Sequence, residues 1–475
     1  MIYYLLHTLL PFKQELLLLL GIFILLLTQI FGGKQHIEWT LQWVNLLLLI
    51  IVLAGFWPVG YNSAFSNMYQ LTALNAFEKS VLAFAAYIIS LQGYNWLQRF
   101  EHTYEFYVLV LSSLLGMFCM LSSTNFLFFY IGLELSTLPL ALLVNFQLNK
   151  KQSSEAAFKF IMSAAFASAI LLLGISFLYG LSGSLNFNAV AAKLILNPFS
   201  LVAFLLFLVG VLFKVSVVPF HLWTADVYEG APISVTAFLS VVSKASVLFV
   251  LLNLLFKVFY HLQSVWHIVM LILLLVTIVI GNLFALRQEN FKRFMAFSSI
   301  TQVGFILVAF LGNAYNASTA VVYFLVIYLF SNLAVFGVIT YVENAFNKQN
   351  INEFKGLYKK NKFLSWVLLI GLFSLAGIPP TAGFFGKFFL IMSGSENLNY
   401  IPWITLAAVN LIISLYYYLR VAIVVFDNNV EFDEPTIAIP QPIKLSFIIC
   451  IVGILITGVG SWIYHYIYSL TAAAF

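Results

Sequence analysis

The amino-acid sequence predicts an all-α polytopic membrane protein with about 14 transmembrane helices. The chain is 63% hydrophobic and only 8% charged, whereas a soluble domain carries about 25% charged residues. Its apolar residues come in repeated runs of about twenty, the length of a helix that crosses a bilayer. Strands of a membrane barrel would instead alternate in polarity over about ten residues. A helical membrane fold is therefore predicted.

The apolar runs leave no long linker between them, so residues 1–475 are predicted to form a single transmembrane domain. The first run is interpreted as a spanning helix and not as a signal peptide, because bulky residues follow it at Gln29, Ile30 and Phe31. The twelfth run is too long and too rich in Gly and Pro to be one straight helix. In chain order, the candidate spans cover residues 15–31, 40–57, 74–92, 105–122, 125–146, 154–180, 199–221, 231–256, 262–286, 294–312, 317–343, 363–393, 401–426 and 443–468.

The positions of Lys and Arg predict how the spans are oriented, because basic residues gather in loops on the inner side of a membrane. With the N-terminus outside, thirteen of the 22 Lys and Arg residues fall in inner loops, and three fall in outer segments (Lys13, Lys193 and Lys257). An even number of spans then places the C-terminus outside as well. Lys79 falls near the outer end of its helix, where its amine is expected to reach the membrane surface.

The sequence argues against metal, nucleotide and nucleic-acid binding. Its two cysteines, Cys119 and Cys450, lie in apolar runs, which excludes a disulfide framework and a self-contained iron–sulfur or structural zinc site. No GxGxxG or Walker-type glycine loop is present. The net charge of +5 comes mostly from short loops, so it does not indicate nucleic-acid binding. We expect this chain alone to hold no cofactor or metal and to pass no electrons.

Four ionisable residues lie well inside the predicted spans. They are Glu134 in the fifth span, Lys214 in the seventh, Lys244 in the eighth and Lys387 in the twelfth. An ionisable group near the membrane centre costs at least about 2.5–3.5 kcal/mol on insertion scales, so it persists only where it faces the protein interior, a partner or water. These positions are therefore candidate functional residues.

The chemistry that one acid and three amines could perform in a membrane is proton relay. A lysine shielded from water holds its proton less tightly, and a nearby carboxylate reverses that effect. Small changes in hydration or in the position of a partner can therefore switch its proton occupancy. The alternative is a set of static buried ion pairs. A single intramembrane lysine would suggest a relay and a static pair about equally. Three lysines and a glutamate favour the relay.

Two of these spans are predicted to be broken. Pro219 lies five residues after Lys214, and Pro379, Pro380 and Gly383 come just before Lys387. Proline removes a backbone hydrogen bond from a helix, and freed backbone groups at membrane depth are tolerated where they line a polar cavity. A lysine beside an interrupted helix in each half of the chain is typical of internal repeats built around ion sites.

Other polar residues are weaker candidates. Glu155 and Lys159 are four residues apart and can pair across one helical turn, as a structural pair or as a site of proton uptake. His221 follows the break at Pro219 and could relay protons, although a structural histidine at a helix end is slightly favoured. Asp226 and Glu229 are expected in an inner loop, where they would cap the next helix or bind a neighbouring subunit.

The stretch from Lys214 to Lys244, KVSVVPFHLWTADVYEGAPISVTAFLSVVSK, resembles the core of the antiporter-like proton-pumping subunits of respiratory complex I. VPFHxW followed by DVYxGAP, with a lysine at position 244, is similar to the branch called subunit N in bacteria and subunit 2 in mitochondria. The GIPPxxGF motif before Lys387 fits the same branch. Glu134 within LELSTLP, residues 155–180 and residues 292–300 agree, so the resemblance covers about residues 105–426.

This resemblance implies a function for each candidate residue. Glu134 and Lys214 would form the ion pair of a first half-channel, Lys244 would be the central lysine, and Lys387 would be the terminal lysine of the second half. The family's two half-channels come from inverted five-helix repeats, here residues 105–256 and 262–426. Helices 1–3 (residues 1–104) would precede them, and a single C-terminal helix (443–468) would follow.

The resemblance also implies partners and a location. The chain would sit in membrane lipid between other complex I membrane subunits and would couple NADH:quinone electron transfer to proton export. FMN, iron–sulfur clusters and quinone would belong to the partner subunits. The absence of a targeting segment suits a bacterial or an organelle-encoded protein, and the motifs favour a bacterial plasma (inner) membrane over the mitochondrial inner membrane.

Two departures and two alternatives accompany the resemblance. Ala225 replaces the proline usual before DVY, and Gln302 stands where relatives often have a histidine, which argues against a histidine link between the two halves. A subunit of a multi-subunit Na⁺/H⁺ antiporter would share the fold and the lysines. A structural membrane scaffold with static charge pairs is the alternative from another class.

Overall fold

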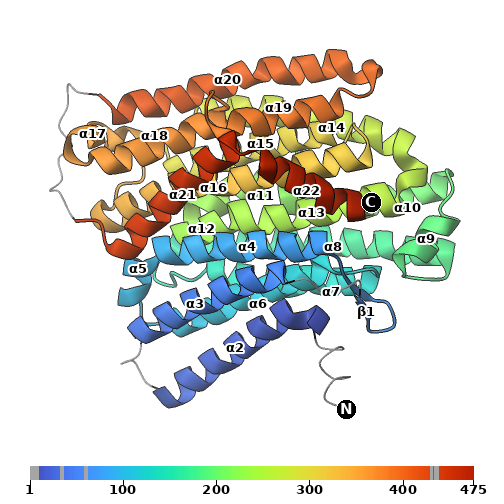
Figure 1. Ribbon diagram of the computed structural model, residues 1–475, viewed down its shortest axis with the longest axis horizontal. Coiled ribbons are helices and arrows are strands. Elements are labelled where there is room, and N and C mark those ends of the chain that lie inside the picture. The colour runs from blue at the N-terminus through green and yellow to red at the C-terminus, as the bar shows by residue number, and fades with distance from the viewer. Residues whose placement is uncertain (1–9, 33–36, 58–61, 428–431, 433–437, 475) are drawn as a thin grey trace.

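The computed structural model describes residues 10–32, 37–57, 62–427, 432 and 438–474. Its long helices lie side by side in a slab, with the axes of most of them roughly aligned (Figure 1). One end of the slab, called here the α5 end, carries the short helices α5 (Tyr94–Arg99) and α17 (Leu357–Lys360). The opposite end, called the β1 end, carries strand β1 (Asn62–Ala64) and helix α9 (Phe187–Lys193).

The N-terminal part consists of three long helices and a β-hairpin. The helices are α2 (Lys13–Gly32), α3 (Ile37–Phe56) and α4 (Ala73–Gln92). Strand β1 pairs antiparallel with β2 (Tyr69–Leu71). Helix α4 begins directly after the hairpin, because the Thr72 hydroxyl accepts the backbone N–H of Asn75 and caps the first turn. The first three predicted spans coincide with these helices.

Two groups of helices follow, and their members come in the same order. The first group holds α6 (Thr103–Leu121), α7 (Phe126–Val144), α8 (Lys151–Ser182), the pair α10 (Pro198–Val215) and α11 (Leu222–Gly230), and one helical span from Ile233 to Val258. The second holds α14 (Gln263–Leu286), α15 (Phe291–Ala309), α16 (Ala314–Phe346), the pair α18 (Lys362–Ala376) and α19 (Ala382–Gly394), and α20 (Ile401–Val425). In each group the third helix is the longest, with 32 residues in α8 and 33 in α16, and the fourth is broken. This order is what two five-helix repeats would give, and their boundaries stay a prediction.

Twelve helices in the described ranges are long and apolar enough to cross a membrane. Helix α15 and the shorter pair α18 and α19 occupy the places of the tenth and twelfth predicted spans. The predicted breaks in the seventh and twelfth spans are confirmed, because α10 ends at Val215 and α18 ends at Ala376. The total of fourteen spans stays a prediction.

The C-terminal segment departs from the single helix predicted over residues 443–468. Helix α21 (Gln441–Val459) ends before Gly460, and α22 (Ser461–Ala474) continues at an angle to it (Figure 1). Gly460 has a non-helical ψ of 83°, and glycine weakens a helix because fixing it costs the most backbone entropy. Helix α22 then packs against α16 and α4. The prediction of one C-terminal helix is therefore wrong.

The helices differ in how much of their surface the protein covers. In the span from Ile233 to Val258 and in α16, 94% and 89% of the apolar stretch is buried inside the protein, against 28% in the first span. A helix that is apolar all round is stable in the core of a membrane bundle. Both helical groups meet at these two central elements, and the candidate lysines lie around them.

Candidate functional site

Lys214 lies in the last turn of α10 and is only 7% exposed. Its amine donates a 2.6 Å hydrogen bond to the hydroxyl of Thr137 on α7. Glu134 lies three residues earlier on α7, so both side chains are on the face that Lys214 approaches. The structure places no ion pair between Glu134 and Lys214, and the Glu134 Oε1 atom is buried without a hydrogen-bond partner among the described residues. In this structure the Lys214 amine therefore binds the Thr137 hydroxyl, and the ion pair with Glu134 that the resemblance implies stays a prediction.

The helix that carries Lys214 is interrupted just after this residue. Ser216 adopts a left-handed backbone with φ 65°, and the helix resumes only at Leu222. Pro219 has no N–H to donate within this gap. His221 lies at the start of α11, is 8% exposed, and has a buried Nδ1 atom without a hydrogen-bond partner in the described structure. The break thus places an unsatisfied imidazole nitrogen close in sequence to the Lys214 site.

Lys244 occupies the middle of the central span and is 2% exposed. The five residues before it, Leu239–Ser243 (η3), form a π-helical segment, a wider turn that often occurs at functional sites. The Lys244 amine donates to the hydroxyl of Ser299 on α15 at 2.8 Å and lies 5.6 Å from the ring centre of Tyr228. A hydroxyl and an aromatic face therefore stabilise this amine.

Lys387 lies on α19, directly after the second break, and is 3% exposed. Its amine donates to the carbonyl of Leu375 at 2.6 Å and to that of Ala376 at 3.2 Å. These carbonyls belong to the last turn of α18, which Gly377 ends with a left-handed φ of 86°. The last carbonyls of a helix have no partner within it and carry the negative end of its dipole. The break in the helix thus supplies the acceptors that hold this lysine.

Helix α15 connects Lys244 to Lys387. Ser299, which binds Lys244, lies one turn before Gln302 on this helix. The Gln302 amide donates to the Leu375 carbonyl at 3.0 Å, the same oxygen that binds Lys387, and to the Tyr418 hydroxyl at 3.1 Å. Polar groups on α15 therefore lie between the central and terminal lysines, with Ser299 bound to Lys244 and Gln302 bound to the carbonyl that holds Lys387.

A second line of hydroxyls and amides lies on α16. Ser240, just before Lys244, contacts the Tyr328 hydroxyl at 3.1 Å and accepts from the Asn332 amide at 3.4 Å. On the same helix, Ser331 contacts Ser374 at 2.6 Å, next to the break between α18 and α19. Sequence reasoning missed these residues and Ser299, although several polar side chains inside an apolar span were a usable signal.

A charged cluster surrounds a cavity of about 260 Å³ between α8, α11 and α15. Lys159 pairs with Glu155 at 2.9 Å, as predicted, and with Asp226 at 2.7 Å. Arg293 pairs with Asp226 at 2.9 Å and with Glu229 at 2.7 Å. Burial alone would raise the pKa of the Asp226 carboxyl, but the hydrogen bonds from Lys159 and Arg293 outweigh it and lower that pKa below its usual value.

The expectation for Asp226 and Glu229 is corrected by this geometry. They lie in helix α11 and not in a loop, and they bind side chains of this same chain. The next helix begins after Pro232 without a side-chain cap. Contacts with α8 and α15, distant in sequence, hold this short segment as a helix.

The expectation that Lys79 reaches the membrane surface is also wrong. Lys79 is fully buried and forms an ion pair with Glu15 of α2 at 2.5 Å. Its amine also donates to the Tyr69 hydroxyl at 3.1 Å. A carboxylate 64 residues away in sequence therefore keeps this amine inside the bundle.

The described residues contain no group of three or more His, Cys, Asp or Glu side chains placed to hold a metal ion. The expectation that flavin, iron–sulfur clusters and quinone belong to partner subunits stays a prediction. A slab of spanning helices, two of them broken, with buried lysines joined by polar side chains, defines the class as a polytopic membrane protein with a polar path inside its core.

The comparisons with known proteins identify the family. The family model described as NADH:quinone oxidoreductase/Mrp antiporter, TM matches residues 123–414. The chain is 43% identical over 97% of its length, and 97% of the relative's, to NADH-quinone oxidoreductase subunit N of Azobacteroides pseudotrichonymphae. The chain belongs to this family of NADH:quinone oxidoreductase and Mrp antiporter membrane subunits.

Solved structures share the fold. A chain of respiratory complex I from Thermus thermophilus with bound aureothin is 26% identical, with a TM-score of 0.81 over 95% of this chain and 98% of that one. A chain of the Mrp complex from Dietzia sp. DQ12-45-1b is 20% identical, with a TM-score of 0.86 over 98% of this chain and 97% of that one. Because both complexes share the fold, only sequence similarity favours one branch.

Proposed function

We propose that this chain is a proton-carrying membrane subunit of a respiratory NADH:quinone oxidoreductase. Its protons would move along Glu134, Lys214, Lys244 and Lys387. The observation that carries the proposal is the line of polar groups from Lys244 through Ser299 and Gln302 to the carbonyl that binds Lys387. Three buried amines, two of them beside helix breaks, would be costly to retain in a membrane without a function.

The partners of the lysines suit transfer of protons. None of Lys214, Lys244 and Lys387 forms an ion pair with a described residue, so no fixed carboxylate holds its proton. Hydroxyls, amides and carbonyls surround the amines, and these groups can hydrogen-bond water as well as the charged and neutral lysine. The buried Glu134 oxygen without a partner would accept the proton or the amine of Lys214 when the side chains rearrange.

Lys159 and His221 would assist proton transfer near Lys214. Lys159 lies at the charged cavity of about 260 Å³ and is already paired with two carboxylates, so we assign it a role in attracting protons. His221 follows the break after Lys214 and offers an unpartnered ring nitrogen. With the basic residues on the inner side, the α5 end faces the cytoplasm and both termini face outward.

The setting follows from the same proposal. The subunit would lie in a bacterial plasma membrane, with other membrane subunits on both sides and lipid around it. Flavin, iron–sulfur and quinone chemistry would take place in those partners. A subunit of an Mrp-type Na⁺/H⁺ antiporter is the second candidate, because the fold is equally close to such a chain.

The test is to measure proton pumping and quinone reduction together in membrane vesicles that carry Lys214→Ala or Lys387→Ala. We expect both activities to fall at least about tenfold in an assembled complex. Lys360→Ala, an exposed lysine at the α5 end, is the matched control. Normal pumping in both core variants would contradict the relay and leave the charges as structural groups. Sodium-dependent exchange without NADH oxidation would favour the antiporter.

A further inference from the structure

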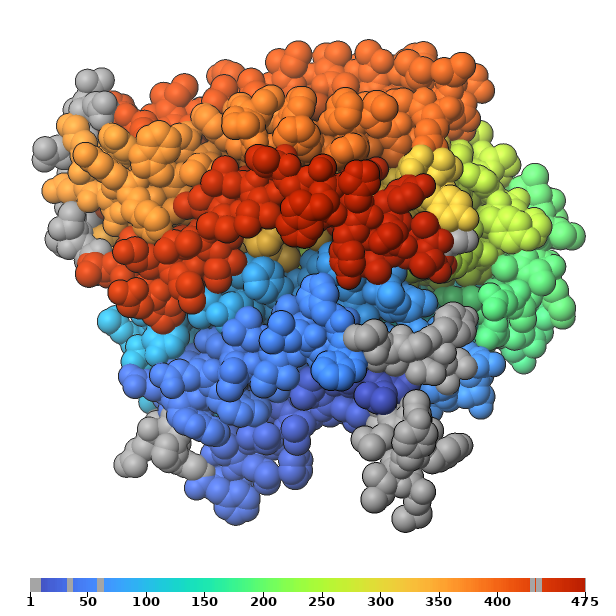
Figure 2. All heavy atoms as spheres, in the orientation of Figure 1, coloured from blue at the N-terminus to red at the C-terminus, as the bar shows by residue number. Residues whose placement is uncertain are grey.

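Two cavities lie on one seam of the molecule. The seam is bounded by α4 and α5 on one side, by α21 and α22 on the other, and by α16 at its floor. Figure 2 shows this face hollowed between the blue surface of α3 and α4 and the red surface of α21 and α22. The proton path described above uses none of the residues that line the seam.

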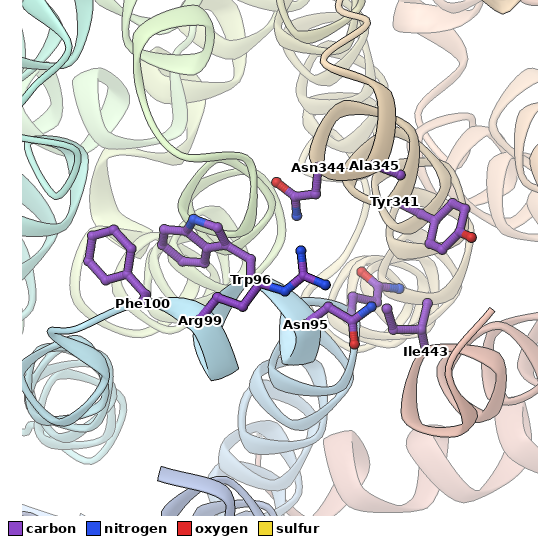
Figure 3. A pocket seen from close by; sticks show the side chains of 9 residues that line it. Asn95, Trp96, Arg99, Phe100, Tyr341, Asn344, Ala345 and Ile443 are labelled. Carbon is purple, nitrogen blue, oxygen red and sulfur yellow. The ribbon is translucent and has the colours of Figure 1, made fainter. Parts of the chain in front are cut away.

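The first cavity opens at the α5 end and has a volume of about 390 Å³. Arg99, Asn95 and Asn344 supply its polar groups, and Trp96 and Tyr341 supply aromatic rings. Figure 3 shows the Arg99 guanidinium extending toward the Asn344 amide, with Asn95 beside it. Arg99 forms no ion pair with any described residue, and none of the described residues that line the cavity is acidic. Among the described residues, the cavity therefore presents a positive charge without an acidic partner and amide donors, the groups that bind a phosphate.

The second cavity continues along the same helices toward the β1 end and has a volume of about 500 Å³. Phe84, Phe330 and Val452 are among its apolar walls. The Ser80 and Thr457 hydroxyls in its lining donate to backbone carbonyls of their own bundle, and Tyr466 contributes a further hydroxyl to an otherwise apolar wall. A groove of this mostly apolar composition suits hydrocarbon.

The spacing of the two cavities matches one lipid molecule. Ile443 lines the first cavity and Val452 lines the second, nine residues further along α21. At 1.5 Å per residue this separation is about 14 Å. The hydrocarbon of one leaflet is about 15 Å thick. A headgroup in the first cavity would therefore place its acyl chains in the groove.

We propose that this seam binds an anionic phospholipid from the leaflet at the α5 end. Its phosphate would bind Arg99, with Asn95 and Asn344 as further donors, and its acyl chains would lie over Phe84 and Phe330. Trp96 and Tyr341 would lie at the level of the headgroup, where aromatic side chains are favoured. Basic pockets between spanning helices are typical sites for anionic headgroups. The lipid would join the N-terminal helices to α16 and α21.

The experiment is native mass spectrometry of the purified complex, titrated with phosphatidylglycerol and, separately, with phosphatidylcholine and inorganic phosphate. Arg99→Ala should weaken phosphatidylglycerol retention about tenfold, because charged hydrogen bonds to phosphate are lost. Arg287→Ala, an exposed arginine outside the seam, should leave retention unchanged. Assembly and Tm without added lipid are compared first, so that a folding defect is not read as lost binding.

Two matched substitutions on α21 test whether the acyl chains of the lipid lie in the groove. Val452→Phe fills the groove and should lower retention, whereas Ile448→Phe, on the same helix but outside the groove lining, should not. Equal retention of phosphatidylglycerol by Arg99→Ala and the unaltered chain would overturn the proposal. An effect of Arg99→Ala on inorganic phosphate but none of Val452→Phe on lipid would also overturn it. Loss of subunit assembly in Val452→Phe with unchanged lipid retention would show that a neighbouring helix occupies the groove.

Discussion

The buried lysines of this molecule fall into two environments, which differ in whether a carboxylate contacts the amine. Near the N-terminus, Lys79 is fully buried and held by the carboxylate of Glu15 and the hydroxyl of Tyr69. In the core, Lys244 and Lys387 are buried almost as deeply, but only hydroxyl and carbonyl oxygens accept their hydrogen bonds. Burial alone does not distinguish them, whereas the carboxylate does.

The difference teaches what each lysine can do. A carboxylate in direct contact stabilises the charged amine, so the proton of Lys79 stays in place. Neutral acceptors stabilise the charged amine less, so the protons of Lys244 and Lys387 can leave when water or a neighbouring group accepts them. We therefore interpret the N-terminal pair as structural and the core lysines as functional. The following predictions test this comparison, beginning with the largest expected effect.

Removing the carboxylate from the N-terminal pair should have the largest effect on stability. Glu15→Gln leaves a buried charged amine without its partner, which costs about 3–5 kcal/mol. The unfolding free energy in a denaturant titration measures this cost. Glu38→Gln, which alters an exposed carboxylate, should cost less than about 1 kcal/mol. If Glu15→Gln were as stable as the Glu38 control, the Lys79 pair would not be structural.

Removing a core amine should instead affect activity. Lys387→Met leaves no carboxylate uncompensated, so the complex should assemble while proton pumping falls at least about tenfold. Rates of pumping and of quinone reduction in vesicles measure the effect, with Lys360→Met as the control on an exposed lysine. Failure to assemble, with pumping per assembled complex unchanged, would assign Lys387 a structural role like that of Lys79.

The link through α15 should show a smaller effect. Gln302→Leu removes the donor that joins Leu375 and Tyr418, and we expect pumping to fall several-fold. Gln302→His keeps a ring that can donate and accept protons, so it should retain most of the activity. The ratio of pumping rates in the two variants checks the link. Equal activity of the Leu variant and the unaltered chain would show that protons do not pass Gln302.

The smallest effect concerns pH and the surface cluster. Because Lys159 and Arg293 lower the pKa of Asp226 in the folded protein, the carboxylate stabilises the fold at pH values above the unfolded pKa of about 3.9. That stabilisation is lost as the pH falls through the lower folded value. Asp226→Asn should therefore be less stable near pH 7, by no more than about 1 kcal/mol because the pairs are partly exposed. Unfolding titrations at pH 7 and near pH 3 should show the difference shrink, and a growing difference would contradict it.

The sequence predicted the spans and the breaks because both depend on local physics. A bilayer requires about twenty apolar residues per helix, and the prolines at 219, 379 and 380 each remove a backbone N–H donor from their span. The burial of Lys214, Lys244 and Lys387 followed from their positions within those runs. The end of α21 at Gly460 was missed because one glycine in an apolar run is a weak signal.

The partners of the lysines could not be predicted from sequence. Thr137 and Glu134 lie on the same face of α7, so spacing alone does not decide which one binds Lys214. The contact between Gln302 and Leu375 depends on where the tertiary structure places the end of α18, and these residues are 73 apart. The pair of Glu15 with Lys79 likewise depends on how the tertiary structure brings these side chains of α2 and α4 together. Each of these contacts arises from tertiary structure.

The most direct measurement of the central claim compares proton pumping in vesicles that carry Lys244→Met with pumping in vesicles that carry Glu15→Gln and Lys79→Met together. The double variant removes a whole buried ion pair, so neither charge is left uncompensated. We predict that Lys244→Met assembles but loses pumping, and that the double variant pumps normally once assembled. Normal pumping by Lys244→Met, or its loss in an assembled double variant, would contradict the division between functional and structural lysines.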